Sequence, residues 1–353
     1  MMSDQTVRLA AAQVAPAFLD RDVTIAKAVS VIEEAGRNGA DLVAFPETWV
    51  PGYPMWVYGA AGWDDPAAKR AYARLQANAV EVPSRATEDL CAAARRAGTM
   101  VVIGINERDV TYSKGTLFNS MLYISAEGEL LGVHRKLTPT HAERIIWGVG
   151  DGSTLHVFDT PLGRVGGLIC WEHWMPLSRY AMHAKGEQIH VAAWPEVPDL
   201  HHLASRHYAF EGRCFVVCVG SYMHAHDIPA DFELADILGA GGQFGEDAEE
   251  ILPGGSGIIG PDGSWIAGPV TGREEIIYAE ADLSRIAEEQ LAFDAVGHYN
   301  RPDVFRLFVD TRERRQVEWL GDDDTAVRSA SQPVEQSNGA ALPEPLRTGH
   351  GRG

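Results

Sequence analysis

Three side chains at the ends of apolar segments carry groups that could cooperate in nucleophilic catalysis. Cys170 ends the segment RVGGLIC and precedes a predicted helix, so its thiol is expected at a sheet edge, near N–H groups that stabilise a thiolate or an oxyanion. Glu47 follows DLVAF, where partial desolvation raises a carboxyl pKa toward that of a general base. Lys136 ends LLGVHRK. Taken singly, the three also fit a buried thiol, a loop cap and a solvated surface charge.

A metal site is the competing chemical hypothesis, because the chain has 13 histidines and 4 cysteines. His201, His202 and His207 lie in or just before one predicted helix, but the chain has no HExxH pattern. Cys214 and Cys218 lie in the β-branched run CFVVC, which favours two buried structural thiols. The segments GVGDG and GAGG lack the strand–turn–helix context of a phosphate loop. We therefore expect catalysis without a metal or a cofactor, and interpret His173 in CWEHW as a local hydrogen-bonding residue.

Composition limits the class of partner. The net charge of −19 repels phosphate backbones and anionic lipids, so we expect neither a nucleic acid nor a membrane partner. No apolar run approaches the roughly 18 residues that span a bilayer, and residues 1–9 do not resemble a signal peptide. With so few cysteines, these features predict a cytoplasmic protein with reduced thiols.

The elements that must position these side chains alternate along the chain. Hydrophobic periodicity and turn residues predict strands over 7–14, 41–45, 100–106, 117–125, 130–135, 155–159, 164–169, 188–193, 214–221, 257–260, 264–267 and 276–281. They predict helices over 20–37, 67–79, 84–97, 176–185, 203–213 and 283–290. This alternation, with its several hairpins, favours a mixed sheet covered by helices on one face.

Three segments read as irregular. Residues 50–64 are rich in glycine, proline and aromatic residues and predict a loop. The acidic segment 223–252 predicts a surface insertion. From about residue 332 the chain has few large apolar residues and predicts a disordered tail.

Three separated motifs resemble the nitrilase superfamily of carbon–nitrogen hydrolases. They are PETWVPGYP around Glu47, HRKLTPTHAERIIWGVGDG around Lys136, and GGLICWEHWMPLSRYAMHAKGEQIHVAAWP around Cys170. They stand in the family's order, and the resemblance covers roughly residues 7–310. The stretch CWEHWMPL is similar to the nitrilase branch rather than to the amidase or carbamoylase branches.

The resemblance implies an α/β fold with mixed sheets in a four-layer α-β-β-α sandwich. The hydrolase domain would span residues 1–310, and residues 311–353 would form a C-terminal extension. The resemblance also implies a Glu47–Lys136–Cys170 triad with Glu143 as an additional glutamate beside it. Family members form homo-oligomers, dimers or larger spirals, by pairing subunits across the helices that follow the catalytic cysteine. The segments near 53–75 and 223–252 and the tail are further candidate contact regions.

The expected reaction converts a small-molecule nitrile to a carboxylic acid and ammonia through a thioimidate and a thioester on Cys170. Glu47 would move the protons, while Lys136 and the backbone N–H of Trp171 would stabilise the tetrahedral intermediate. The family's counterparts suggest substrate contacts at Tyr53, His141, Trp147, Trp171 and Trp194. Alternatives are an amidase or carbamoylase, a nitrilase that releases part of its product as amide, and a catalytically silent scaffold. The presence of all three triad residues argues against the scaffold, and the sequence leaves open which nitrile is preferred.

Overall fold

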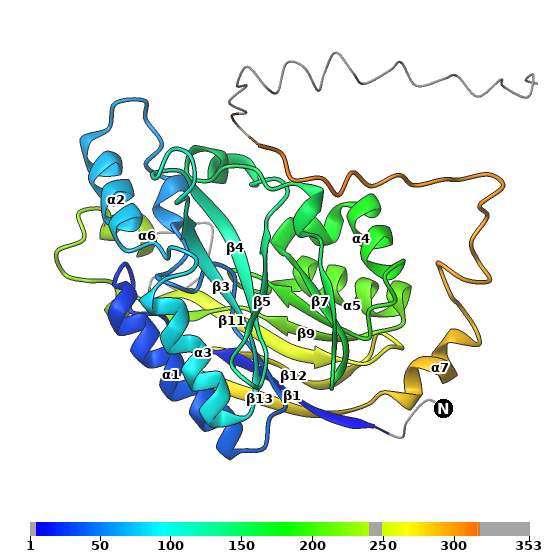
Figure 1. The fold of residues 1–353 in the computed structure, drawn as a ribbon. Helices are drawn as coiled ribbons and strands as arrows, with labels where there is room; N and C mark the ends of the chain where they lie inside the picture. The colour runs from blue at the N-terminus through cyan, green and yellow to red at the C-terminus, as the bar shows by residue number, and fades with distance from the viewer. Residues whose placement is uncertain (1–4, 240–248, 316, 318–353) are drawn as a thin grey trace, which may run out of the picture. The chain divides into compact units, whose positions relative to one another are not determined.

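The computed structural model describes residues 5–239, 249–315 and 317. Residues 1–314 form one compact unit and residues 315–353 a second; the fold and the site belong to the first (Figure 1). The tail predicted from about residue 332 lies outside the described residues. In the described part of the chain, no helix has both the length and the apolar character needed to cross a bilayer.

Two mixed sheets form the centre of the compact unit (Figure 1). The first has the order β13-β1-β2-β3-β4-β5 and is built from β1 (Thr6–Gln13), β2 (Leu42–Ala44), β3 (Met100–Arg108), β4 (Leu117–Ile124), β5 (Leu130–Arg135) and β13 (Glu275–Asp282). The second has the order β10-β11-β9-β8-β7-β6, with β12 also paired to β11. Its strands are β6 (Val157–Thr160), β7 (Gly163–Ile169), β8 (Ile189–Ala193), β9 (Phe215–Val219), β10 (Tyr222–His224), β11 (Glu250–Ile259) and β12 (Trp265–Thr271).

The two sheets pack face to face, and each is covered by helices on its other face. One buried cluster joins Leu9 and Leu42 of the first sheet to Val217 of the second. The same cluster takes in residues of α4 (Pro176–His183) and α5 (Asp199–Gly212). A second cluster packs α1 (Arg21–Arg37) and α3 (Arg85–Ala97) against the first sheet. Figure 1 shows these helix pairs on opposite sides of the sheets, which confirms the four-layer α-β-β-α sandwich.

Local signals set the ends of the helices that the sequence predicted well. The carboxylate of Asp20 accepts a hydrogen bond from the Val23 amide and starts α1. Gly98, with a φ of 63°, ends α3 in the left-handed conformation that glycine adopts without strain. The smaller helices are α2 (Pro66–Ala77), α6 (Ala235–Gly239) and α7 (Ser284–Gln290), and the 3₁₀ turns are η1 (Met55–Tyr58), η2 (His141–Ile145), η3 (Gly152–Thr154), η4 (Cys170–Trp174) and η5 (Ala225–Asp227).

The structure corrects three of the predictions. The alternation of elements suggested one mixed sheet, but the strands divide into two, because β6 to β12 pair among themselves. The helix predicted from Leu203 begins at Asp199. The strand predicted from Gly257 begins at Glu250, because its register shifts at Gly254 and lets a glycine-rich segment stay paired.

The segment 223–252 is not a plain surface insertion. Its described residues include part of β10, which pairs with β11, and helix α6. Phe232, Leu234 and Leu238 are buried in one cluster with Trp56 of η1. The sequence missed this burial because the apolar residues of DFELADIL are interspersed with acidic ones and fit neither a helical nor a strand period over the whole segment. Residues 240–248 lie outside the described part of the chain.

Candidate active site

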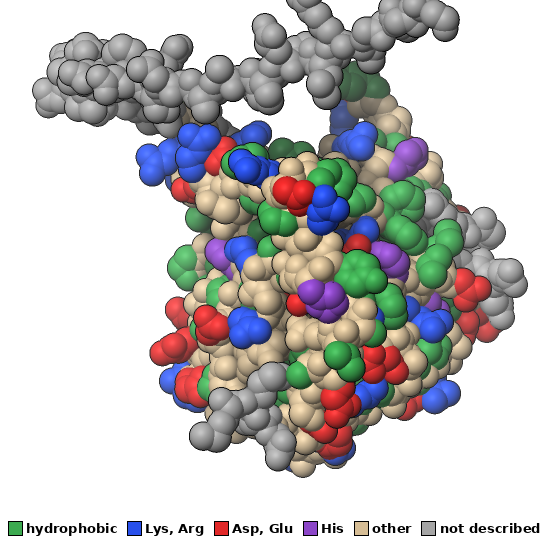
Figure 2. All heavy atoms as spheres, turned by 90° about the vertical axis from the view of Figure 1, so that its right-hand side faces the viewer, with side chains coloured by type: hydrophobic (Ala, Val, Ile, Leu, Met, Phe, Trp, Pro, Cys, Tyr) green, Lys and Arg blue, Asp and Glu red, His purple; other side chains and the backbone are tan. Residues whose placement is uncertain are grey.

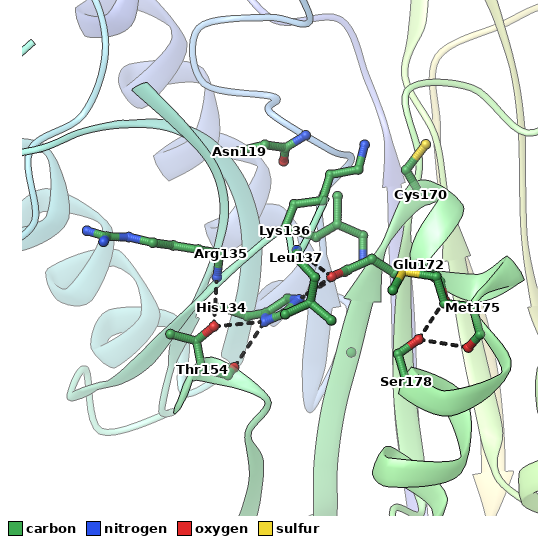
Figure 3. Close-up of polar contacts among 12 residues, drawn as sticks. Asn119, His134, Arg135, Lys136, Leu137, Thr154, Cys170, Glu172, Met175 and Ser178 are labelled. Carbon is green, nitrogen blue, oxygen red and sulfur yellow. Dashed lines mark hydrogen bonds and ion pairs between the residues drawn. The ribbon is translucent and has the colours of Figure 1, made fainter. Parts of the chain in front are cut away.

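Strand ends from both sheets bring four predicted catalytic residues to one place. Glu47 follows β2, Lys136 follows β5 and Cys170 follows β7, while Glu143 lies in η2. One carboxylate oxygen of each glutamate and Sγ of Cys170 all lie within 4.8 Å of one another. Figure 3 shows the side chains of Lys136 and Cys170 pointing the same way from their separate strands. All four residues are buried, so their charges act on one another with little screening by water.

Glu47 is fixed by contacts to both sheets. Its amide donates to the carbonyl of Trp194 (3.1 Å), which follows β8. Its Oε1 accepts hydrogen bonds from Asn119 Nδ2 (2.6 Å) and Lys136 Nζ (2.9 Å). Its Oε2 is buried without a hydrogen-bond partner among the described residues. That oxygen is therefore the atom of Glu47 that remains to take a proton from another group.

Burial raises the pKa of Glu47 to about 7, although the ammonium of Lys136 partly opposes the shift. Transfer of a carboxylate from water into a dry site disfavours its charged form, which is the physical cause of the shift. A carboxyl group with such a pKa can both accept and return a proton near neutral pH.

Lys136 holds the two glutamates together. Its Nζ lies 2.9 Å from Glu47 Oε1 and 2.7 Å from Glu143 Oε2. Burial lowers the pKa of Lys136, but the interactions of its ammonium with the acidic groups of Cys170, Glu47 and Glu143 outweigh this effect and raise the pKa well above the usual value. Lys136 is therefore an ammonium ion in this site.

Glu143 is itself held by three donors. Its Oε2 accepts the Thr140 amide (2.6 Å) as well as Lys136, and its Oε1 accepts the hydroxyl of Tyr53 (2.5 Å). The Tyr53 hydroxyl lies 2.8 Å from that of Tyr58. All three groups donate to Glu143, so they favour its ionised form and fix the position of its carboxylate.

Cys170 is more deeply buried than the sequence suggested. Only 4% of the residue is exposed, whereas a position at the sheet edge predicted an accessible thiol. The residue has a φ of 54°, a strained conformation for a residue with a Cβ. Burial, and then the charge of Glu47, raise the thiol pKa well above its usual value, although Lys136 opposes them. The resting group is therefore a thiol that needs a base, and the adjacent carboxyl of Glu47 can be that base.

The cysteine and the two glutamates also form a donor set of the kind that binds metal ions. The ammonium of Lys136 already contacts both carboxylates and supplies the positive charge that a cation would bring. The other candidate pair, Cys214 and Cys218, consists of buried free thiols, and Cys218 Sγ lies 3.3 Å from the Ser205 hydroxyl. Both observations favour chemistry carried by side chains.

Two predicted substrate-contact residues, Tyr53 and Trp147, lie beside Glu143. Their ring centroids are 5.7 Å apart, and the indole of Trp147 donates to Asn106 Oδ1 (2.9 Å). His141 is exposed, has a φ of 48°, and lies parallel to the ring of Tyr58 with 6.3 Å between centroids.

The other two predicted contact residues differ in burial. Trp171 follows the nucleophile and is 51% exposed. Trp194 is fully buried, and its indole donates to Ser205 (3.1 Å) while its ring stacks on those of His173 and His201. Trp194 reaches Glu47 through its main-chain carbonyl rather than through its ring.

Sequence reasoning missed two polar residues that the site uses, Asn119 and Glu172. Asn119 lies in β4 and binds Glu47, and a polar Asn-Ser pair inside a mostly apolar strand was the signal available. Glu172 lies two residues after the nucleophile in CWEHW, a motif that was used to identify the family but not to assign a role to its glutamate. His173 was interpreted as a local hydrogen-bonding residue, and this is confirmed by its Nδ1, which lies 2.7 Å from the Cys170 carbonyl oxygen.

Comparison with known proteins agrees with this geometry. The family model described as carbon-nitrogen hydrolase matches residues 8–289. A protein named Nitrilase 2, from an unknown prokaryotic organism, is 43% identical over 316 residues, which cover 88% of this chain and 95% of that protein. An aliphatic nitrilase from Rhodococcus rhodochrous is 42% identical over 331 residues, covering 88% of this chain and 85% of that protein. The crystal structure of a carbon-nitrogen hydrolase from Helicobacter pylori G27 has the same fold, with a TM-score of 0.66 at 19% identity, over 86% of this chain and 97% of that one.

Proposed function

The chain belongs to the carbon–nitrogen hydrolase family, and on that premise we propose that it is a nitrilase with Cys170 as its nucleophile. The observation that carries the proposal is the buried cluster in which Glu47, Glu143 and Cys170 surround the ammonium of Lys136. Relatives named as nitrilases, about 40% identical over most of both chains, support a nitrile as the substrate. We assign the hydrolase domain to residues 1–310 and an extension to 311–353, in keeping with the family match over residues 8–289.

The first half of the reaction makes the covalent intermediate. Oε2 of Glu47 takes the thiol proton as Sγ of Cys170 attacks the nitrile carbon, and the same proton then passes to the nitrile nitrogen. The product is a neutral thioimidate, with one C–S bond formed and one C–N π bond broken. No charge remains on the nitrogen, so the step suits a site from which water is largely excluded.

The second half consumes two water molecules. The first adds to the thioimidate carbon and, after protonation of nitrogen, the tetrahedral species expels ammonia and leaves a thioester. The second hydrolyses the thioester to the carboxylic acid and restores the thiol. Lys136 and the backbone N–H of Trp171 stabilise the tetrahedral species, and one such donor typically contributes about 3 kcal/mol. The proposed role of Glu143, whose Oε2 lies 2.7 Å from Lys136 Nζ, is to orient or deprotonate the water.

Aromatic side chains around the cluster are the proposed contacts for the substituent of the nitrile. Support comes from the positions of Tyr53 and Trp147 beside Glu143 and of Trp171 beside the nucleophile. The proposed set also includes His141 and Trp194. The ring of Trp194 lies in the core, and its main-chain carbonyl accepts the amide of Glu47. The aromatic rings of Tyr53, Trp147 and Trp171 favour an apolar substituent.

Ammonia release from a panel of nitriles, compared with the matching amides, tests the function. We expect the acid and ammonia from at least one nitrile, and no turnover by a Cys170→Ala variant that still folds. Activity confined to amides would assign the chain to the amidase or carbamoylase branch. Mass analysis of the products separates complete hydrolysis from partial release of amide, and turnover by Cys170→Ala would remove Cys170 from the mechanism.

We further propose that the chain forms a homo-oligomer through the face of α4 and α5. Exposed apolar side chains gather there: Trp174 (38%), Leu177 (67%), Leu200 (66%), Leu203 (56%) and Phe210 (46%). Figure 2, which looks onto this side, shows hydrophobic side chains spread among histidine and charged ones. Several large exposed apolar side chains on two neighbouring helices are a feature of protein interfaces.

The net charge of −19 argues against a nucleic acid or an anionic membrane as partner. We also propose a cytoplasmic location. All four cysteines are free, and the proposed nucleophile needs a reduced thiol.

A further inference from the structure

We propose that Glu172 is a positioning residue whose buried carboxylate holds the backbone segments of Lys136 and Cys170 at a fixed separation across the two sheets. Glu172 does not touch the proposed reacting atoms. It acts on the two residues that do, and the inference rests on the proposed function of that site.

The carboxylate of Glu172 bonds the peptide next to each of these residues. Its Oε1 accepts the amide of Leu137 (2.8 Å), the residue after Lys136. Its Oε2 accepts the amide of Ile169 (2.7 Å), the residue before Cys170. Figure 3 shows the Glu172 carboxylate beside Leu137, with the Cys170 and Lys136 side chains extending above it. One side chain therefore connects the two segments directly.

A charged histidine completes the arrangement. Nε2 of His134, in β5, lies 2.9 Å from Glu172 Oε2, and its Nδ1 lies 3.0 Å from the carbonyl oxygen of Thr154. Both ring nitrogens face acceptors, so both carry protons and His134 is an imidazolium ion. Burial lowers the pKa of His134, but the charge of Glu172 raises it more. The pair is thus a buried ion pair, His134 and Glu172 each being at most 1% exposed in the side chain.

The two sheets need such a connection because β5 and β7 belong to different ones and share no backbone ladder. Packed faces of sheets are held by non-directional contacts, whereas catalytic groups must be placed to within about 0.5 Å. A charge-assisted hydrogen bond to each segment supplies direction and stiffness. Two further described hydrogen bonds link the sheets near the site. One joins the Glu47 amide to the Trp194 carbonyl and the other joins the Tyr123 hydroxyl of β4 to the Gly167 carbonyl of β7, and neither binds the segment of Lys136.

This arrangement makes Glu172 intolerant of glutamine. Its four contacts come from the N–H groups of Leu137, Ile169 and His134. A glutamine amide would point its own N–H₂ group at one of those backbone donors, so one of the two segments would lose its bond. Aspartate keeps the charge but is shorter by one methylene, so it cannot reach both segments.

Glu187 provides a matched control on the other side of Cys170. His173 Nδ1 faces the Cys170 carbonyl oxygen, so it must donate; its Nε2 then accepts from His190 Nε2 (2.9 Å). With both histidines neutral, Nδ1 of His190 accepts from Glu187 Oε1 (2.9 Å), while Glu187 Oε2 accepts from Tyr208 (2.6 Å). Glu187 is then a protonated acid, which agrees with a pKa that burial raises to about 8. Glutamine can make both of its bonds.

The kinetic test compares Glu172→Gln, Glu172→Asp and Glu187→Gln with the wild type on a nitrile that the wild type hydrolyses. We expect kcat to fall at least about 50-fold in Glu172→Gln and about 10-fold in Glu172→Asp, with KM within about threefold. Glu187→Gln should keep kcat within about threefold. Circular dichroism identifies any variant that fails to fold, and Glu172→Asp decides the question if Glu172→Gln does not fold. Equal losses in Glu172→Gln and Glu187→Gln, or wild-type kcat in both Glu172 variants, would overturn the proposal.

A second measurement needs no substrate and so separates this inference from the proposed function. Alkylation of Cys170 by iodoacetamide is followed by mass analysis of its peptide at neutral pH. We expect alkylation at least about fivefold slower in the Glu172 variants and unchanged in Glu187→Gln. In the Glu172 variants the ammonium of Lys136, which lowers the pKa of the Cys170 thiol, is no longer held at a fixed separation from it. Unchanged or faster alkylation in the Glu172 variants contradicts the inference even if the wild type hydrolyses nitriles. If the Glu172 variants are alkylated more slowly than a wild type that hydrolyses no nitrile, the positioning role stands and the proposed function is rejected.

Discussion

At the scale of single residues, the site works by keeping its nucleophile neutral until substrate arrives. Burial and adjacent carboxylates hold the proton on Cys170, while burial brings the pKa of Glu47 to about 7. The thiol and the carboxyl group are therefore partners in one proton transfer. If the thiol proton had already been lost to water, Glu47 would have no proton from Cys170 to move to the nitrile nitrogen.

The pH dependence of kcat/KM follows from this pairing. Glu47 must be unprotonated to accept the thiol proton, so kcat/KM should fall as the pH drops below about 7, the pKa given by burial of the carboxyl group. The expected acid limb approaches tenfold per pH unit, measured as initial rates between about pH 5 and about pH 8. A flat profile over this range would exclude Glu47 as the base.

Glu143 is expected to be as sensitive as the triad. In a Glu143→Gln variant an amide N–H₂ group would face donors, either Lys136 and the Thr140 amide or the Tyr53 hydroxyl. We expect kcat to fall at least about 100-fold, measured as ammonia release, while Glu129→Gln on the surface is unchanged. An unaltered rate in Glu143→Gln would make Glu143 a structural residue only.

At the scale of elements, the site depends on how closely the segment after β2 crosses β3. Gly104 of β3 lies directly beneath this segment, and its carbonyl accepts the amide of Val50 (3.1 Å). A Cβ at Gly104 would collide with the carbonyl oxygen of Pro46 and the amide nitrogen of Thr48, the two neighbours of Glu47. The absence of a side chain at Gly104 therefore lets the segment that carries Glu47 pack closely against β3, and this contact fixes the position of Glu47.

A Gly104→Ala variant tests this dependence. Backbone atoms cannot give way cheaply, so Glu47 should move relative to Lys136 and Cys170, and kcat/KM should fall at least about 100-fold. Stability should fall as well, by about 1–3 kcal/mol for an overpacked core, measured by urea unfolding. Gly62→Ala is the matched control, since its added Cβ would meet nothing nearer than 3.6 Å. Wild-type kinetics in Gly104→Ala would show that the segment shifts without disturbing Glu47.

At the scale of the whole molecule, the apolar side chains on α4 and α5 are the feature that the compact unit alone leaves unexplained. The same helices pack their other sides, including Met182 and Tyr208, into the core over the second sheet. An assembly through this face would therefore contact the helix layer of α4 and α5, which packs against the sheet that carries Cys170. Assembly and catalysis are then expected to be linked.

Charge placed on this face should break the proposed oligomer. A Leu200→Glu, Leu203→Glu double variant should show a lower mass in sedimentation velocity, because burying two carboxylates against apolar surface is unfavourable. Val23→Glu, on α1 and also exposed, should leave the mass unchanged. An unaltered mass in the double variant would place the interface elsewhere.

The sequence by itself determined the local elements and the identity of the reacting groups. The ends of α1 and α3 and the hairpin of β4 and β5 agree with the predictions, because caps, turns and periodicity act over a few residues. The three motifs named the residues that the structure brings within reach of one another. These features needed no knowledge of distant contacts.

Only the tertiary structure decided how those groups behave. The burial of Cys170, the pKa of Glu47 and the link through Glu172 each depend on segments far apart in the chain. The pattern of elements alone suggested one mixed sheet, and the two-sheet sandwich was expected only from the family resemblance. The burial of Phe232 escaped prediction altogether. The physical reason is common to all of them: desolvation, charge interactions and close packing depend on which side chains become neighbours in space, and local patterns along the sequence do not encode that.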